Sequence, residues 1–149
     1  MMLFNIEIGD WSGDGHDQSQ TFLCRADATI QCLREAYFKV QSVIGIDLTE
    51  VCGEYGEEHM NIGHAEVLLE HEIIDRDMFD RLTSDKSYSS RTRPIDIAVI
   101  VRNCLNYVEP DYNVRFEKPQ ARIPSLHFSG FDSQGRHIGQ IGYGVFGND

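Results

Sequence analysis

The sequence predicts an α+β fold in a single domain, with an antiparallel sheet and a central group of helices. Apolar residues alternate with polar ones near both ends of the chain, which is the spacing of strands, and recur every three or four positions in between, which is the spacing of helices. Helices grouped between runs of strands are typical of α+β folds. The 149 residues are 41% hydrophobic and 25% charged, which fits one globular domain over 1–149.

The N-terminal part of the chain predicts a β-hairpin. Phe4, Ile6 and Ile8 alternate with polar residues, and residues 20–25 have the composition of a second strand that pairs with the first. A polar, glycine-rich loop over 9–19 joins the two strands.

The middle of the chain predicts three or four helices. Leu33, Tyr37 and Val40 lie on one face of the first helix, which Asp27 is expected to cap and Gly45 to end.

A capping-box pattern over 47–50 predicts a short second helix, and Asn61 is expected to begin a third. Residues 75–82 either continue that helix or restart it at Asp75. After a polar stretch over 83–93, expected to be a mobile loop, Pro94 opens a helix of about fifteen residues.

The C-terminal part predicts three more strands, so that the sheet has about five strands, two N-terminal and three C-terminal. Tyr112, Val114 and Phe116 alternate with polar residues and predict the first of the three. Residues 126–128 belong to the second strand, and residues 136–146 form the third.

Negative charge is concentrated in the predicted helical middle. Residues 47–80 contain eleven acidic residues and a single base, Arg76, for a net charge of −10, whereas 86–136 carry eight bases and five acids, a net charge of +3. An acidic surface repels phosphate and attracts basic proteins. The sequence therefore predicts a non-enzymatic protein-binding module, inhibitor-like or immunity-like, that recognises a basic protein and not nucleic acid. The residues expected to make contact are Glu54, Glu57, Glu58, Glu66, Glu70 and Glu72.

The loop GDWSGDGHD, over 9–17, is an alternative site, because it resembles the first half of a calcium-binding loop. Asp10, Ser12 and Asp14 take the first three ligand positions, and the backbone carbonyl of His16 takes the fourth. Thr21 occupies the position where a calcium loop has its bidentate glutamate. The sequence predicts no other cofactor.

The same loop also suggests an enzyme, as a further alternative. His16, flanked by Asp14 and Asp17, has the composition of a general base that a carboxylate orients. Since the sequence shows no complete catalytic constellation, the non-enzymatic interpretation is preferred.

We expect a cytoplasmic protein without a membrane-spanning segment. The N-terminus has neither the charged nor the apolar region of a secretory signal, and no apolar run approaches the length that crosses a bilayer. The four cysteines form no C-x-x-C pair, which predicts reduced thiols rather than disulfides or a zinc site.

Overall fold

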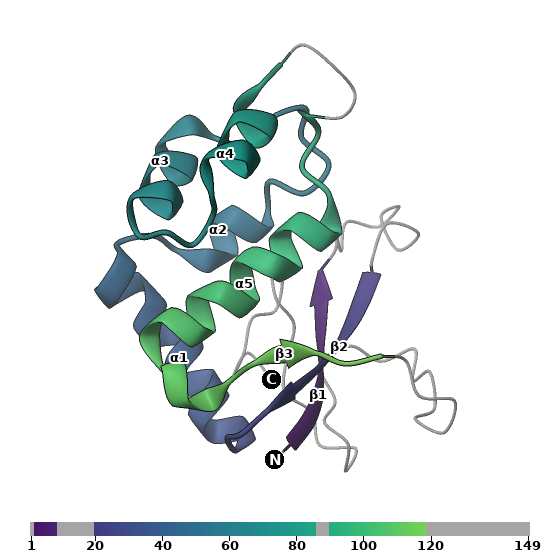
Figure 1. Ribbon diagram of the computed structural model, residues 1–149, viewed down its shortest axis with the longest axis vertical. Coiled ribbons are helices and arrows are strands. Elements are labelled where there is room, and N and C mark those ends of the chain that lie inside the picture. The colour runs from purple at the N-terminus through teal and green to yellow at the C-terminus, as the bar shows by residue number, and fades with distance from the viewer. Residues whose placement is uncertain (1, 9–19, 86–89, 119–149) are drawn as a thin grey trace.

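A computed structural model of the protein describes residues 2–8, 20–85 and 90–118. These residues form an α+β fold in which a small antiparallel sheet of order β1-β2-β3 packs against a group of helices (Figure 1). The elements are β1 (Met2–Ile8), β2 (Gln20–Ala26), α1 (Ile30–Ile44), α2 (Leu48–Cys52), α3 (Ile62–Glu70), α4 (Arg76–Thr83), α5 (Pro94–Val108), the 3-10 helix η3 (Pro110–Tyr112) and β3 (Arg115–Phe116).

The predicted N-terminal hairpin is confirmed. β1 and β2 pair in antiparallel register, with Phe4 opposite Cys24 and Ile6 opposite Phe22. Because neighbouring strand residues point to opposite faces, Phe4, Ile6 and Ile8 all reach the core, where each has no exposed surface. The period-two pattern of the sequence is thus the core-facing side of the sheet.

Helix α5 is the central element of the helical layer. It packs against α1, α2 and β1, and Ile97, Val101 and Cys104 on it are fully buried. Pro94 occupies its first turn, where the missing N–H costs no helical hydrogen bond. α3 and α4 lie together at the end of the molecule away from the sheet (Figure 1).

The boundaries of α1 follow capping chemistry, with one correction to the expected cap. The hydroxyl of Thr29, not the carboxylate of Asp27, accepts a hydrogen bond from the backbone N–H of Cys32. Asp27 instead lies near β3, where its backbone N–H donates to the carbonyl of Tyr112 at 2.8 Å. Gly45 ends the helix, as predicted, with φ of 86° in the left-handed region that glycine tolerates best.

The prediction of about five strands is wrong, because the sheet has three strands in the described residues. The first of the three C-terminal strands shrinks to Arg115–Phe116, since Tyr112 ends η3 and the Asn106 side chain occupies both backbone groups of Val114. The other two, over 126–128 and 136–146, lie outside the described residues.

The expected number of helices, three or four, is also corrected to five α-helices in the described part of the chain. The additional helix arises because residues 62–83 split into α3 and α4. Glu72 has φ of 59°, a left-handed conformation that cannot continue a right-handed helix, and Asp75 then caps α4 by accepting from the backbone N–H of Met78.

Residues at the end of the expected mobile loop 83–93 contact the turn after α2. The backbone N–H of Thr92 donates to the carbonyl of Glu57, and the N–H of Gly56 donates to the carbonyl of Thr92, both at 3.1 Å. The Ser90 hydroxyl donates to the carbonyl of Glu58. The mobility of the loop itself stays a prediction.

Within the described ranges, no helix combines the length and the apolar character needed to cross a membrane.

Candidate functional site

The acidic segment 47–80 folds into α2, α3 and α4, and its own polar residues begin each of these helices. Asp47 accepts from the N–H of Thr49 at the start of α2, Asn61 caps α3, and Asp75 caps α4. These side chains accept hydrogen bonds from backbone N–H groups of the first helical turn, which have no acceptor within the helix. Three polar residues of the segment are thereby assigned to folding rather than to recognition.

Five of the six glutamates that the sequence proposes for protein binding are exposed, and none of the five forms an ion pair with another described residue. Two of them lie in the turn after α2, two lie on the outer face of α3, and one follows the residue that caps the C-terminus of α3. These five residues, which we call the acidic face, are Glu57, Glu58, Glu66, Glu70 and Glu72.

The turn that carries Glu57 and Glu58 is held by backbone contacts rather than by its carboxylates. The carbonyls of Glu57 and Glu58 accept hydrogen bonds from Thr92 and Ser90, respectively, and both of these partners are buried. Their side chains are exposed at a turn whose backbone is fixed. A fixed backbone lowers the conformational entropy that a binding partner must remove.

The outer face of α3 brings two like charges together. Glu66 and Glu70 are four positions apart, so they are neighbours on the helix surface, where like charges destabilise a helix by a few tenths of a kcal/mol. Ile62, one turn earlier on the same face, is 59% exposed. The face combines unpaired carboxylates with an apolar side chain, and none of the three contributes to the core.

Glu72 occupies a position where glycine is the usual residue. The N–H of Ile73 donates to the carbonyl of Leu68, and the N–H of Glu72 donates to that of Leu69, which is the Schellman pattern that closes α3. The pattern requires φ of 59° at Glu72, and a side chain in that region costs about 1–2 kcal/mol.

Glu54, the sixth proposed residue, does not belong to the acidic face. Its side chain is only 13% exposed, and its carboxylate lies 2.6 Å from Nδ1 of His64 on α3. Burial raises the pKa of this carboxyl, and the hydrogen bond from His64 only partly offsets that effect. Glu54 therefore joins the turn after α2 to α3.

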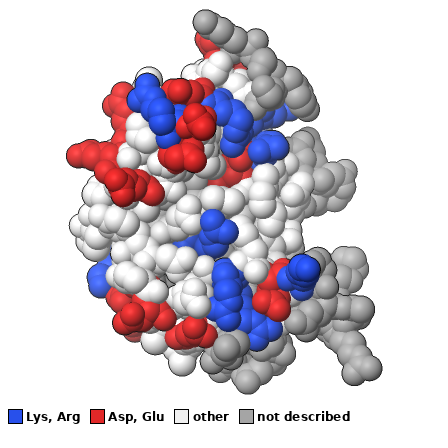
Figure 2. Space-filling model, viewed as in Figure 1, with Lys and Arg blue, Asp and Glu red and all other residues white. Residues whose placement is uncertain are grey.

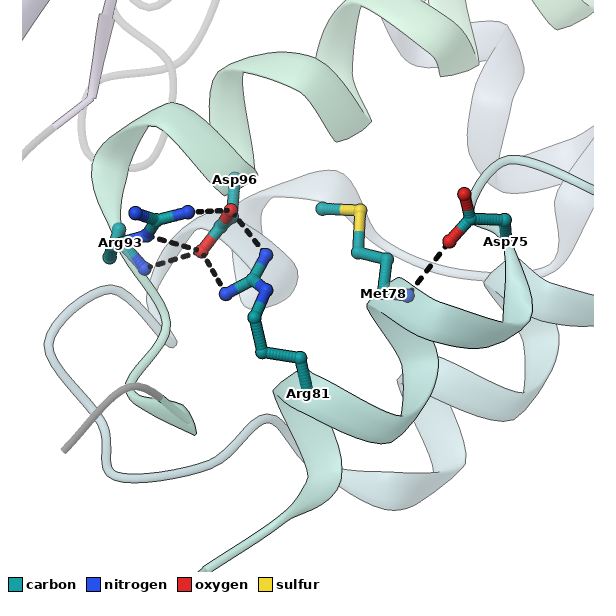
Figure 3. Close-up of polar contacts among 5 residues, drawn as sticks. All are labelled: Asp75, Met78, Arg81, Arg93 and Asp96. Carbon is teal, nitrogen blue, oxygen red and sulfur yellow. Dashed lines mark hydrogen bonds and ion pairs between the residues drawn. The ribbon is translucent and has the colours of Figure 1, made fainter. Parts of the chain in front are cut away.

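The nearby arginines neutralise a carboxylate outside the acidic segment. Asp96, buried at the start of α5, accepts hydrogen bonds from both Arg81 and Arg93 (Figure 3). Within the segment, Arg76 pairs with Asp80. Figure 2 accordingly shows basic side chains among the carboxylates at the α3–α4 end, although no described residue forms an ion pair with the glutamates of the acidic face.

The alternative sites in the loop over 9–17 lie outside the described residues. Calcium binding by Asp10, Ser12, Asp14 and the His16 carbonyl stays a prediction, as does general-base catalysis by His16 with Asp14 or Asp17. In the part of the chain that the structure describes, no three histidine, cysteine, aspartate or glutamate side chains form a group able to hold a metal ion.

Comparison of the chain with protein-family models, with curated proteins and with solved structures finds no match.

Proposed function

We propose that the chain is a small acidic protein-binding module, non-enzymatic and inhibitor-like or immunity-like, that recognises a basic protein through the segment 47–80. The observation that carries the proposal is the acidic face itself. Its five glutamates are exposed and without a cationic partner among the described residues, and they lie on α3 or in the turns on either side of it; α3 itself is at the end of the molecule away from the sheet (Figure 1).

Two local costs support a role for these carboxylates outside the fold. Glu66 and Glu70 repel each other across one helical turn, and Glu72 keeps a side chain at a position suited to glycine. Backbone strain of this kind clusters at binding and switch sites. Binding of a basic protein would account for both costs.

Complementary charge would act mainly on the rate of association. A cluster of negative charge steers a basic protein toward it, and added salt screens the attraction within a Debye length of about 8 Å at physiological ionic strength. The same charge disfavours nucleic acid, whose phosphates it repels. We also place the protein in the cytoplasm, a proposal supported by four free thiols, three of them buried.

The test compares two variants with equal net charge. Glu66→Lys with Glu70→Lys reverses two charges on the acidic face, whereas Glu35→Lys with Asp111→Lys reverses two exposed charges elsewhere. Each protein is immobilised, and binding of basic proteins is measured at about 50 mM and about 500 mM salt.

The proposal requires tight, salt-sensitive retention of a specific basic protein by the wild type and the control variant, and at least tenfold weaker retention by the acidic-face variant. Equal losses in both variants would show that only the total charge matters. Undiminished binding by the acidic-face variant would place recognition elsewhere on the molecule.

A further inference from the structure

His64 lies between two carboxylates that come from the α2 side of the acidic segment. Its Nδ1 is 2.6 Å from Oε1 of Glu54, and its Nε2 is 3.5 Å from Oε2 of Glu50. The ring is 22% exposed and Glu54 is 13% exposed, whereas Glu50, on α2, is 68% exposed. Each ring nitrogen therefore faces a carboxylate, one enclosed by protein and the other free to move into solvent.

The chemistry of imidazole makes these two contacts unequal. Neutral histidine carries one N–H donor, whereas the imidazolium carries two. The shorter and more buried contact to Glu54 retains a proton on Nδ1 in both states, because an Nδ1 lone pair facing a carboxylate oxygen 2.6 Å away would be strongly unfavourable. The proton that comes and goes is consequently the one on Nε2, which faces Glu50.

We propose that His64 is a proton-operated link between α2 and α3, which holds Glu50 when Nε2 is protonated and releases it when Nε2 is neutral. The charged groups in contact with the ring are Glu50 and Glu54, and Glu57 acts on Glu54 through space. Histidine is the side chain that ordinarily changes charge between about pH 5 and 8, so the link is tested at pH values on either side of that range.

Deprotonation changes the surface next to the acidic face in two ways. The cluster of His64, Glu50 and Glu54 goes from a net charge of −1 to −2, by loss of the one positive charge on the ring, and Glu50 becomes a free carboxylate. Resting on the proposed function, this predicts tighter capture of a basic protein as the pH rises. The link itself needs no partner and is tested without one.

The experiment is a double-mutant cycle on the full chain, with Glu50→Gln, His64→Gln and the two combined. Thermal unfolding is followed at about pH 5.5 and about pH 8, on either side of the range in which histidine titrates. Glu66→Gln, which removes a charge on α3 that has no ion pair among the described residues, is the matched control.

We expect Glu50→Gln to lower the unfolding temperature by about 1–3 °C at the lower pH and to leave it unchanged at the higher pH. In the His64→Gln background the same change should have no effect at either pH. An effect of Glu50→Gln that is equal at both pH values, or that persists without His64, would overturn the link.

A second measurement keeps the proposal testable if His64→Gln weakens the fold. The carboxyl carbon of Glu50, assigned through Glu50→Gln, should titrate in NMR spectra together with the ring protons of His64. A Glu50 signal that is indifferent to the ring titration would refute the link. Since neither readout contains a partner, failure of the link and failure to find a basic partner are separate results.

Discussion

The Arg81 guanidinium of α4 donates two hydrogen bonds to the buried carboxylate of Asp96 on α5, at 2.6 and 3.0 Å (Figure 3). Because one guanidinium spans both carboxylate oxygens, the contact fixes α4 relative to the first turn of α5. Arg93, which precedes that turn, donates to the same carboxylate from its side chain and its backbone. Asp96 thereby holds together the two sides of the 83–93 segment.

Removing Arg81 should be far more damaging than removing its exposed neighbour on α4. Arg81→Met leaves the Asp96 carboxylate, only 5% exposed, with one guanidinium, and should lower the free energy of unfolding by about 3 kcal/mol. Arg76→Met disrupts an exposed pair with Asp80 and should cost no more than about 0.5 kcal/mol. Urea unfolding of both variants measures the difference, and equal losses would contradict the assigned role.

The carboxylate of Asp96 also makes the stability of the fold depend on pH. Burial alone would raise the pKa of Asp96, but hydrogen bonds from Arg81 and Arg93 outweigh it, so that the pKa lies below its usual range. An aspartate in the unfolded chain titrates near pH 3.9, so Asp96 contributes its full stabilisation above that pH and loses it as the pH falls through its lower folded value.

Asp96→Asn should therefore reduce the free energy of unfolding by a constant amount from about pH 7 to 5 and by progressively less below about pH 4. Urea unfolding of wild type and variant at a series of pH values provides the two curves. A gap that keeps its size into strong acid would mean that the carboxylate charge is not what stabilises the fold.

Glycine at position 72 should stabilise the protein while weakening partner binding. Glu72→Gly relieves the left-handed strain at φ of 59°, partly offset by a more flexible unfolded chain, for a net gain of about 0.5–1 kcal/mol. Glu66→Gly removes a carboxylate from the middle of α3 and should instead cost about 1 kcal/mol. If the two variants change stability in opposite directions but both bind the basic protein more weakly, the two carboxylates act in binding and not in folding. A destabilised Glu72→Gly would show that the side chain contributes a contact.

The elements that the sequence predicts correctly are those with long apolar periodicity. Leu33, Tyr37 and Val40 form the buried face of α1, because a pattern sustained over fifteen residues leaves one direction for the core. The alternating apolar residues of β1 likewise predict the core-facing side of the hairpin that β1 forms with β2. The sequence does not decide between one helix and two over residues 62–83, because the break depends on one backbone conformation at Glu72 that no side-chain pattern indicates.

The C-terminal strand that is shorter than predicted shows how a tertiary contact can override a local sequence pattern. Tyr112, Val114 and Phe116 alternate as strand residues do, yet the side chain of Asn106 on α5 holds both backbone groups of Val114, as a neighbouring strand would. The two bonds, 2.7 and 2.8 Å long, replace a ladder that the period-two pattern anticipates. Nothing in the residues 112–116 indicates a partner on a preceding helix.

Asn106→Ala should accordingly lower the free energy of unfolding by about 2–4 kcal/mol. It leaves the N–H and the carbonyl of Val114, which is 2% exposed, without a hydrogen-bond partner. Asn106→Asp keeps the acceptor for the N–H and loses the donor, so its loss should be intermediate near neutral pH. Chemical denaturation gives the order of the three proteins. A loss within about 0.5 kcal/mol for alanine would show that water replaces the side chain without penalty.

In the candidate site, too, the sequence predicts some features correctly and misses others. The exposure of Glu66 and Glu70 follows from their position opposite the buried stripe of α3, which the sequence shows. The burial of Glu54 does not, because it depends on His64, ten positions away and on another element. A glutamate between Cys52, Tyr55 and the helix caps has no local feature that marks it as buried.

Calcium binding by the loop over 9–17 is the prediction that rests on the sequence alone. Asp10, Ser12 and Asp14 supply the early ligands, but Thr21 cannot provide the bidentate carboxylate, so any binding should be weak, with a Kd of about 0.1–1 mM. Titration calorimetry should then show heat for calcium that disappears in Asp14→Ala and persists in the control Asp111→Ala. Magnesium should give a smaller response, because it demands a tighter octahedral cage. Absence of heat at millimolar calcium would leave the loop with the turn chemistry that its aspartates and glycines also support.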